Sequence, residues 1–482
     1  MPHLALPSLQ SDVHPGRAAP AAGATPGQWL VEKRRWLTAI AAMLMMTTLG
    51  SIYSWSLFTQ PLSAGFGWSN TTTTWAFALA IFFLGLGALA GGRLQDRFGP
   101  RKVALAGVTM WGLGNMLAGL GTPTLGAWWL YASYGMIGGF GVGMGYVTPV
   151  TVVTKWFPDR RGLGSGMVVM GFGLGAFVYN SIVKSIPAFG DAAAAAAGHA
   201  AARALAASQH VAFDTLRHAL PPVHMQSIMD VFVVSGIGFL LLGCMCAGFL
   251  KNPPAALAAP ATNLGAPVQG DSYSTREMLH TPQFFLLWLI LFLNVTAGIL
   301  VIGNALPIMQ EMTGAAPHLV AAIFGGLALF NALGRLFWGA LSDRIGRNRA
   351  YALIFAIQAC VFFMLNDLHT LLPVMLAYAV ILFCFGGGFG IMPSFSADYF
   401  GTRHMGANYG ALLTAWGVAG LVGPLFAARV KDLTGSFSGA LPVVAAVLLL
   451  ATVLPLITKK PVSAPALRRR STHGREYQDA TA

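Results

Sequence analysis

Charged residues are scarce in this 482-residue chain: they make up 9% of it, whereas hydrophobic residues make up 55% and the mean hydropathy is +0.64. A soluble globular protein carries about 25% charged residues, because its folded surface faces water. The scarcity therefore excludes a soluble enzyme, a disordered chain and a nucleic-acid-binding domain. An integral membrane protein is the class that this composition predicts.

Cysteine and ligand-binding patterns are scarce as well. The four cysteines all lie inside apolar runs: Cys244, Cys246, Cys360 and Cys384. They form neither a CxxC pair of the kind that binds zinc nor a disulfide framework, so we expect small buried side chains. The glycine-rich stretches at 135–145 and 162–175 lack the strand and the lysine of a nucleotide-binding loop. We therefore expect no metal and no cofactor, and we expect these glycines to pack helices together.

Long hydrophobic runs are abundant. A membrane-spanning helix needs about 20 mostly apolar residues, and twelve segments qualify: Trp36–Phe58, Thr74–Leu94, Val103–Gly121, Ala127–Val153, Leu163–Val183, Ile228–Leu250, Phe284–Ile308, His318–Leu341, Tyr351–Leu365, Leu371–Ala397, Gly406–Ala428 and Ala440–Ile457. These runs predict an all-α integral membrane protein with twelve transmembrane helices in two six-helix halves.

The segments between the runs suggest the domain organisation. We predict a disordered N-terminal tail over 1–29, an N-terminal six-helix half over 30–250 with an external insertion at 187–226, a cytoplasmic linker over 251–282, a C-terminal six-helix half over 283–458 and a basic cytoplasmic tail over 459–482. The insertion is rich in alanine and has room for a short surface helix.

Lysine and arginine are distributed unevenly over the loops. With both termini inside, all but five of the 29 lysine and arginine residues lie on the cytoplasmic side. The five exceptions are Lys184, Arg203, Arg217, Arg429 and Lys431. Cytoplasmic loops of membrane proteins carry such an excess. The asymmetry therefore predicts a multi-pass protein of the cell (inner) membrane with cytoplasmic termini, and it explains the net charge of +13 without a nucleic-acid partner.

Two loops repeat the same motif. The loop after the second span reads Gly92-Arg-Leu-Gln-Asp96-Arg-Phe-Gly, and the loop after the eighth reads Gly339-Ala-Leu-Ser-Asp343-Arg-Ile-Gly, at an offset of 247 positions. A looser pair follows the fourth and tenth spans, at 156–160 and 399–403. The halves are therefore related copies. Membrane proteins built from repeats are mostly transporters, with the binding site near the midplane between the repeats.

These motifs resemble those of the major facilitator superfamily. Within it, the stretches Ile52-Tyr-Ser-Trp-Ser56 and Lys155-Trp-Phe-Pro-Asp-Arg-Arg-Gly162 are similar to the oxalate/formate antiporter family and to related monocarboxylate transporters. The similarity covers roughly residues 34–458 without the 187–226 insertion. It implies the twelve-helix fold of that superfamily and an organic anion as the substrate.

Arg335 stands out among the charged residues because the sequence places it deep within a span. It lies eight residues before Asp343, which is about 12 Å inside the helix end at the helical rise of 1.5 Å per residue. The spans offer no acid to neutralise it, and its counterpart in the other repeat is Ala88. A buried cation is costly unless it faces a cavity or a partner. We interpret Arg335 as an anchor for a carboxylate, with Asn331 one turn away on the same face; snorkelling of its side chain to the cytoplasm is the alternative.

The resemblance supports this interpretation and adds further residues. Monocarboxylate transporters place a substrate-binding arginine on this helix, four residues before the glycine of the loop motif. The resemblance also implies pocket positions for Tyr53, Tyr146, Phe385, Phe389 and Trp416. Packing in the core or against lipid is the alternative for each of these aromatic residues. Family members that carry dicarboxylates have a lysine at the Trp416 position, and related proton-coupled carriers have an acid at the Asn331 position.

The sequence therefore predicts a secondary active transporter of a small organic anion, with one fixed cation matching one carboxylate. An oxalate/formate-type dicarboxylate exchanger and a transport-inactive receptor remain alternatives. A channel would need a selectivity filter, and an enzyme would need clustered catalytic groups in the spans; the sequence shows neither, so we expect no enzymatic activity.

The expected partners are the organic anion and the lipid bilayer, and the chain is expected to act as a monomer. Whether a proton or a counter-anion moves with the substrate is left open, with Asp398 as a candidate proton carrier. We expect two charged pairs to hold the cytoplasmic helix ends together and bias gating, namely Asp96–Arg97 and Asp343–Arg344.

Overall fold

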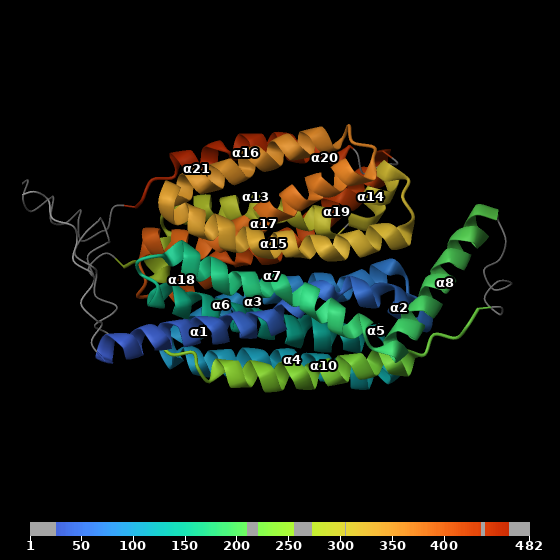
Figure 1. Cartoon of the computed structure of the whole chain (residues 1–482), viewed down its shortest axis with the longest axis horizontal. Helices are drawn as coiled ribbons and strands as arrows, with labels where there is room; N and C mark the ends of the chain where they lie inside the picture. The colour runs from blue at the N-terminus through green and yellow to red at the C-terminus, as the bar shows by residue number, and fades with distance from the viewer. Residues whose placement is uncertain (1–25, 210–219, 255–271, 304, 435–438, 462–482) are drawn as a thin grey trace, which may run out of the picture.

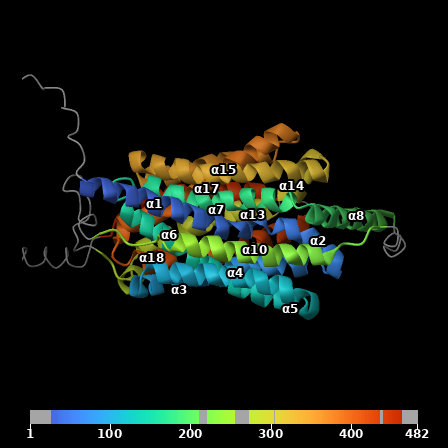
Figure 2. The same ribbon diagram turned by 60° about the horizontal axis from the view of Figure 1, so that its bottom comes forward.

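The computed structural model of the chain describes residues 26–209, 220–254, 272–303, 305–434 and 439–461. Within these ranges the chain is almost entirely helical and has no strand, which confirms the predicted all-α class. Figure 1 shows the helices lying roughly parallel in one elongated bundle, and Figure 2 shows the same bundle from below. The helices before the linker occupy one side of it and those after the linker occupy the other (Figure 1).

The N-terminal group of helices runs from residue 26 to residue 247. Its elements are α1 (Pro26–Gly50), the 3₁₀ turn η1 (Ser51–Ser54), α2 (Ser56–Phe66), α3 (Asn70–Phe98), α4 (Pro100–Leu125), α5 (Ala127–Leu130), the π-helical stretch η2 (Tyr131–Gly138), α6 (Gly139–Trp156), α7 (Arg161–Lys184), α8 (Pro187–Gln209) and α10 (Met225–Ala247).

The C-terminal group follows the linker. Its elements are α12 (Thr275–Leu279), α13 (Pro282–Gly303), α14 (Ala305–Thr313), α15 (Pro317–Ile345), α16 (Arg347–Leu365), α17 (Leu371–Phe400), α18 (Met405–Leu412), α19 (Thr414–Thr434), α20 (Ala440–Ala451) and α21 (Val453–Ile457).

Each of the twelve predicted spans coincides with a helix or with consecutive helices. Ten stretches within the described residues are long and apolar enough to cross a membrane. The other two predicted spans, the eighth and the eleventh, correspond to α15 and to α18 with α19.

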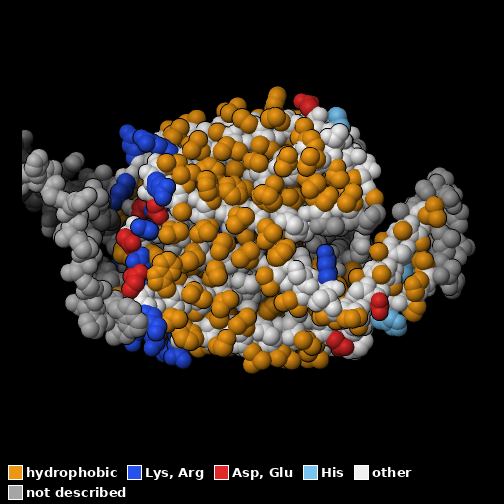
Figure 3. All heavy atoms as spheres, in the orientation of Figure 1, with side chains coloured by type: hydrophobic (Ala, Val, Ile, Leu, Met, Phe, Trp, Pro, Cys, Tyr) orange, Lys and Arg blue, Asp and Glu red, His pale blue; other side chains and the backbone are white. Residues whose placement is uncertain are grey.

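The surface is that of a membrane-embedded bundle. Hydrophobic side chains cover the middle of the visible face, while lysine and arginine gather at one end (Figure 3). We call this end the basic end; it carries the loops that contain Asp96, Lys155 and Asp343. Helix α8 projects from the opposite end (Figure 1).

The sequence-based boundaries differ from the structure in several places. Helix α1 begins at Pro26, inside the predicted tail of 1–29, and residues 1–25 lie outside the described residues. The 187–226 insertion holds α8, a helix of 23 residues rather than a short one. The linker contains α12, whose Ser274 and Glu277 form a capping box. Hydrogen bonds from the backbone and hydroxyl groups of Ser274 lower the pKa of the Glu277 carboxyl.

Two predicted spans are interrupted near the middle of the bundle. The first span breaks at η1, where the chain tightens into a 3₁₀ turn that contains Tyr53. The eleventh breaks at Leu413, between α18 and α19. Hydropathy runs through both breaks without interruption, so the sequence predicted single helices. Such interruptions expose backbone groups and are tolerated in membrane helices where they line a cavity or pack within protein.

Glycines bring the two groups of helices into backbone contact along two seams. In the first seam, α7 meets α15: Gly162 lies against Gly339, and a side chain at Gly166 would come within 2.5 Å of the Arg335 carbonyl oxygen. In the second seam, α3 meets α18, and Gly92 lies against Gly406. Small residues allow this approach between helices in a membrane. Side chains of the two groups that lie next to these seams are therefore brought close together.

Candidate functional site

Arg335 lies at the first seam, fully buried on α15. Its Nε donates a hydrogen bond to Oδ1 of Asn331 at 3.1 Å, and its Nη1 donates to the carbonyl oxygen of Val169 on α7 at 3.2 Å. Among the described residues no carboxylate forms an ion pair with it. The side chain therefore remains inside the bundle rather than extending to the basic end, which disagrees with the snorkelling alternative.

Aromatic rings surround the guanidinium group. Its Cζ lies 4.9 Å from the ring centre of Phe389 and 5.5 Å from that of Phe172, both within cation–π range. Trp416 packs against these two rings, with centroid distances of 4.6 and 5.5 Å. Tyr53 and Tyr146 complete the group, each with its ring close to Phe172 and Trp416. The rings come from both groups of helices and exclude water from Arg335.

Several buried polar groups in this cluster form no well-aligned hydrogen bond. They are Nη2 of Arg335, Nε1 of Trp416 and the hydroxyls of Tyr53, Tyr146 and Tyr409. Tyr53 and Tyr146 both lie within electrostatic reach of Arg335, and Tyr409 within reach of Tyr146. A buried polar group without a partner costs about 1–3 kcal/mol, and more when it is charged. Arginine and tryptophan side chains only donate, whereas a tyrosine hydroxyl both donates and accepts, so neutral hydroxyls are the acceptors nearest to these donors and no anion is among them.

The structure brings together most of the predicted site residues: Arg335, Asn331, Tyr53, Tyr146, Phe389 and Trp416. Phe385 contacts this cluster only through Phe389, whose ring centre lies 5.4 Å from its own. Sequence reasoning missed Phe172 and Tyr409. Phe172 occupies the middle of the ring cluster, and its signal was its place as the single aromatic in the glycine-rich stretch 171–175.

The two loop-motif acids cap helices across the seams. Asp343, at the end of α15, accepts hydrogen bonds from the backbone N–H groups of Gly162 and Leu163 at the start of α7, both at 2.9 Å. Asp96, at the end of α3, accepts from Gly406 and Ala407 at the start of α18, at 3.3 and 2.8 Å. A carboxylate at a helix N-terminus is stabilising. The two caps therefore hold the two groups of helices together at the basic end.

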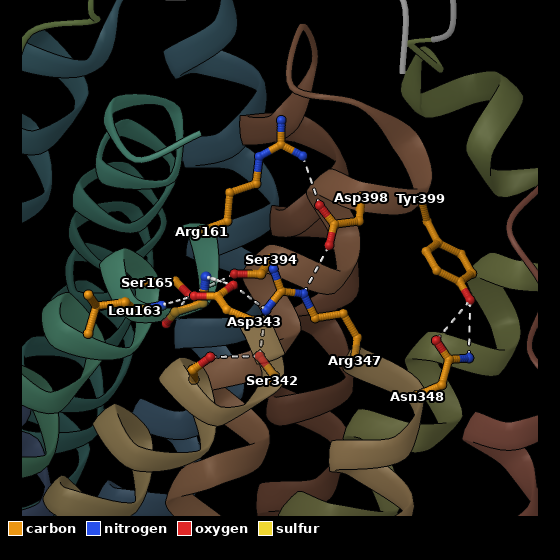
Figure 4. Close-up of polar contacts among 12 residues, drawn as sticks. Arg161, Leu163, Ser165, Ser342, Asp343, Arg347, Asn348, Ser394, Asp398 and Tyr399 are labelled. Atoms are coloured by element: carbon orange, nitrogen blue, oxygen red, sulfur yellow. Dashed lines mark hydrogen bonds and ion pairs between the residues drawn. The ribbon is translucent and has the colours of Figure 1, made fainter. Parts of the chain in front are cut away.

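The arginine that pairs with Asp343 is Arg347, not the predicted Arg344. Arg347 pairs with Asp343 at 2.7 Å and with Asp398 at 2.9 Å, and Asp398 also pairs with Arg161 at 2.8 Å (Figure 4). Arg344 is exposed and forms no hydrogen bond or ion pair with any described residue. Successive residues of an α-helix lie about 100° apart around its axis, so Arg344 does not share the direction of Asp343 toward α7 and is exposed instead.

At the second cap the motif arginine is likewise exposed. Arg97 stacks over the ring of Phe98, 5.1 Å from its centre, and forms no hydrogen bond or ion pair with a described residue across the seam. The acid alone reaches the other group of helices there, as at the first cap. The aspartates thus join the helix ends as expected, whereas Arg97 and Arg344 do not.

Asp398 is poorly placed for the role of proton carrier. Both of its carboxylate oxygens are held by arginines, Oδ1 by Arg161 and Oδ2 by Arg347 (Figure 4). Protonation would remove the charge that both guanidinium groups pair with. Asp398 therefore acts as a strut between the two groups of helices at the basic end.

The central site has the groups that binding an anion requires. Among the described residues, no group of His, Cys, Asp and Glu side chains could hold a metal ion. The rings around Arg335 carry no nucleophile beside a base. What the site offers is one fixed cation, a set of unpartnered donors and a water-excluding aromatic wall.

Comparison with known families and relatives shows which family the chain belongs to. The family model of the Major Facilitator Superfamily matches residues 35–424 and 287–476. The oxalate:formate antiporter of Oxalobacter formigenes is 27% identical over 399 residues, which cover 81% of this chain and 83% of that protein. The apicoplast pyruvate carrier 1 of Toxoplasma gondii is 26% identical over 366 residues, which cover 70% of this chain and 66% of that protein.

Solved structures share the fold at low sequence identity. The fucose:proton symporter of E. coli has a TM-score of 0.63 at 12% identity, covering 88% of this chain and 98% of that one. A proton:xylose symporter has a TM-score of 0.62 at 14% identity, covering 89% of this chain and 97% of that one. Both confirm the helical membrane architecture.

Proposed function

The chain belongs to the major facilitator superfamily, whose members are multi-pass membrane transporters rather than enzymes, and from that premise we propose that it carries a small monocarboxylate by alternating access. The proposal confines the substrate to a class: formate, lactate, pyruvate or a short hydroxy acid. Arg335 binds the carboxylate, Asn331 orients the guanidinium group, and the aromatic rings shape the pocket.

One observation carries this proposal. Arg335 is a fully buried cation with no ion pair among the described residues, and its Nη2 group and the neighbouring Trp416 Nε1 form no well-aligned hydrogen bond. A carboxylate supplies the missing negative charge and charged acceptors for both donors. Charge-assisted bonds of this kind to arginine are roughly twice as strong as neutral ones. The energetic cost of burying the uncompensated charge of Arg335 is thereby converted into affinity for an anion.

The neighbourhood of Arg335 favours one carboxylate over two. Trp416, which packs on Phe389 with ring centres 4.6 Å apart, stands where dicarboxylate-carrying members of the resembling family have a lysine. The alternative is an oxalate/formate-type dicarboxylate exchanger, and the 27% identity to the oxalate:formate antiporter supports it. A dicarboxylate would leave its second charge against aromatic rings, which is costly in a dry pocket.

The proposed transport cycle follows from the two caps. We assign the basic end to the cytoplasm because lysine and arginine concentrate there (Figure 3). With Asp96 and Asp343 capping across the seams, the cytoplasmic side is closed. Release of substrate to the cytoplasm then requires both caps to break. A proton that accompanies the substrate would travel on the carboxylate itself; exchange against a second anion is the other mode.

Transport by Arg335 variants tests the proposal. Arg335→Gln keeps a polar side chain and removes the charge, so affinity for the carboxylate should fall by about ten- to hundredfold. Arg335→Lys keeps the charge and loses the planar fork that reaches Asn331 and Val169 together, so it should also be impaired. Uptake of labelled monocarboxylates into liposomes, at matched reconstitution, measures both.

Arg344→Gln is the matched control, because Arg344 lies on the same helix, is exposed and has no described partner. It should transport like the wild type. Near-normal transport by both the Gln and the Lys variant of Arg335 would remove this residue from the substrate site and refute the proposal.

A further inference from the structure

A basic cavity lies at the basic end, and none of its lining residues belongs to the central site. Its volume is about 460 Å³, and its lining residues come from α6, the loop to α7, both ends of the linker and the loop after α17. Three of them are cations, namely Lys155, Arg161 and Arg403, and no described acid lines the cavity. A cavity of this size is within the range of about 300–1,000 Å³ that small-molecule sites occupy.

The cations keep donor capacity that the protein does not use. Arg403 is exposed and forms no hydrogen bond or ion pair with a described residue. Lys155 likewise forms none, although Asp96 lies within electrostatic reach of it. Arg161 uses Nη1 for Asp398, while its Nε is buried and without a partner. The two nearby acids lie outside the lining, so an excess of positive charge faces the cavity.

The cavity spans the junction between the two groups of helices. The linker is fixed on one side where Nε1 of Trp156 donates to the Lys251 carbonyl at 2.8 Å. It is fixed on the other side where the backbone N–H of Tyr273 donates to the Phe400 carbonyl at 2.9 Å. A ligand held by Lys155 and Arg403 would therefore connect α6 of the first group with the loop after α17 of the second.

We propose that this cavity binds the phosphate monoester group of a small molecule and thereby holds the basic end closed. Two arginines and one lysine match a dianionic tetrahedral group, because guanidinium forks bind phosphate oxygens in pairs and the ammonium adds a point charge. The side chains of Thr154, Asn252, Ser272 and Thr402 supply further hydrogen-bonding groups around the wall. A single carboxylate would satisfy only part of this donor set. The site is independent of the carboxylate site at Arg335.

The test uses the purified full-length protein and its thermal unfolding midpoint. Inorganic phosphate and glycerol 3-phosphate are titrated against sodium chloride at equal ionic strength. Both phosphates should raise the midpoint saturably, and chloride should not. In Arg403→Gln the half-saturating concentration should rise by about tenfold or more, because one charge-assisted bond is lost. Arg403 is exposed, so this variant should fold normally.

Two control variants locate the effect. Arg349→Gln removes an exposed arginine of the basic end that does not line the cavity, and it should respond like the wild type. Arg335→Gln should also keep the full response, whether or not Arg335 binds the transported anion. Loss of the response in Arg335→Gln would place the phosphate in the central site and overturn the proposal. An equal response to chloride, or equal loss in the Arg349 and Arg403 variants, would overturn it too.

The phosphate group could belong to a soluble metabolite or to a lipid headgroup. Reconstitution into phosphatidylcholine with and without phosphatidic acid separates these sources. If phosphatidic acid removes the response to glycerol 3-phosphate in the wild type, the headgroup occupies the cavity. If the response persists, the occupant is soluble. Either result retains a phosphate monoester site that depends on Arg403.

Discussion

Adding one methyl group at Gly406 should open the basic end. An alanine Cβ there would lie 2.6 Å from the Gly92 carbonyl oxygen and 2.7 Å from Oδ1 of Asp96, whereas ordinary contact begins at 3.4 Å. Helices α3 and α18 must therefore separate by about 0.8 Å at this point. The hydrogen bond from the Gly406 N–H to Asp96, already 3.3 Å long, would break. Overpacking of this kind costs about 1–3 kcal/mol, which shifts a two-state equilibrium by about 5- to 150-fold.

Labelling of a buried cysteine measures this shift. Ser394 is fully buried on α17, and its hydroxyl lies 2.9 Å from that of Ser165 on α7, at the other seam. In a background without the native cysteines, Ser394→Cys should react slowly with a membrane-impermeant maleimide applied from the basic end. Adding Gly406→Ala should accelerate the reaction at least about fivefold, because opening one seam exposes the other.

Gly238→Ala is the matched control: Gly238 lies on α10, and a Cβ there meets nothing within 4 Å. It should leave the labelling rate unchanged. Equal rates in the Gly406 and Gly238 variants would show that backbone contact at the seam does not hold the basic end closed, and the reasoning from the glycine seams would fail.

Three further predictions address the caps, the pocket and the topology. Asp343→Asn weakens two backbone hydrogen bonds and an ion pair, so the same Ser394→Cys probe should label about tenfold faster from the basic end; an unchanged rate would exclude the cap from gating. Trp416→Lys should weaken monocarboxylate uptake and admit a dicarboxylate, and wild-type selectivity would exclude Trp416 from the pocket. Cysteines replacing the exposed Ala201 in α8 and the exposed Arg276 in α12 should label from opposite sides of the membrane, whereas labelling from one side would refute the proposed orientation.

The sequence was sufficient for the class, the spans and the central cation. Hydropathy alone located the helices, because a bilayer imposes length and apolarity on each span separately. Arg335 was recognisable because a charge inside a span is rare, and the repeat showed Ala88 at the equivalent position. Asn331 followed from helical spacing.

Features that depend on contacts between helices were not predictable in the same way. Phe172 packs beneath Arg335 because α7 meets α15 at glycines, and the periodicity of α7 does not reveal which helix it faces. Tyr409 escaped notice because nothing in its own segment marks the break at Leu413. The Asp96 cap had a signal in the repeat. Gly162 and Gly406 are each the second residue of a helix that follows the looser repeated loop, so the partner of one acid indicates the partner of the other.

The exchange of caps between the two groups of helices has the form of an isologous interface. The acid of the first copy completes a helix of the second, and the equivalent acid of the second copy completes the equivalent helix of the first, as residues pair in a two-fold symmetric dimer. The two groups of helices in this sense resemble the subunits of a homodimer that are covalently joined by the linker, and the same type of contact occurs twice between them. One equivalent position at which the two copies differ is Arg335 in the second copy and Ala88 in the first. The pseudo-dimer therefore holds a single buried cation, at the first seam, so the proposed carboxylate site occurs once per chain.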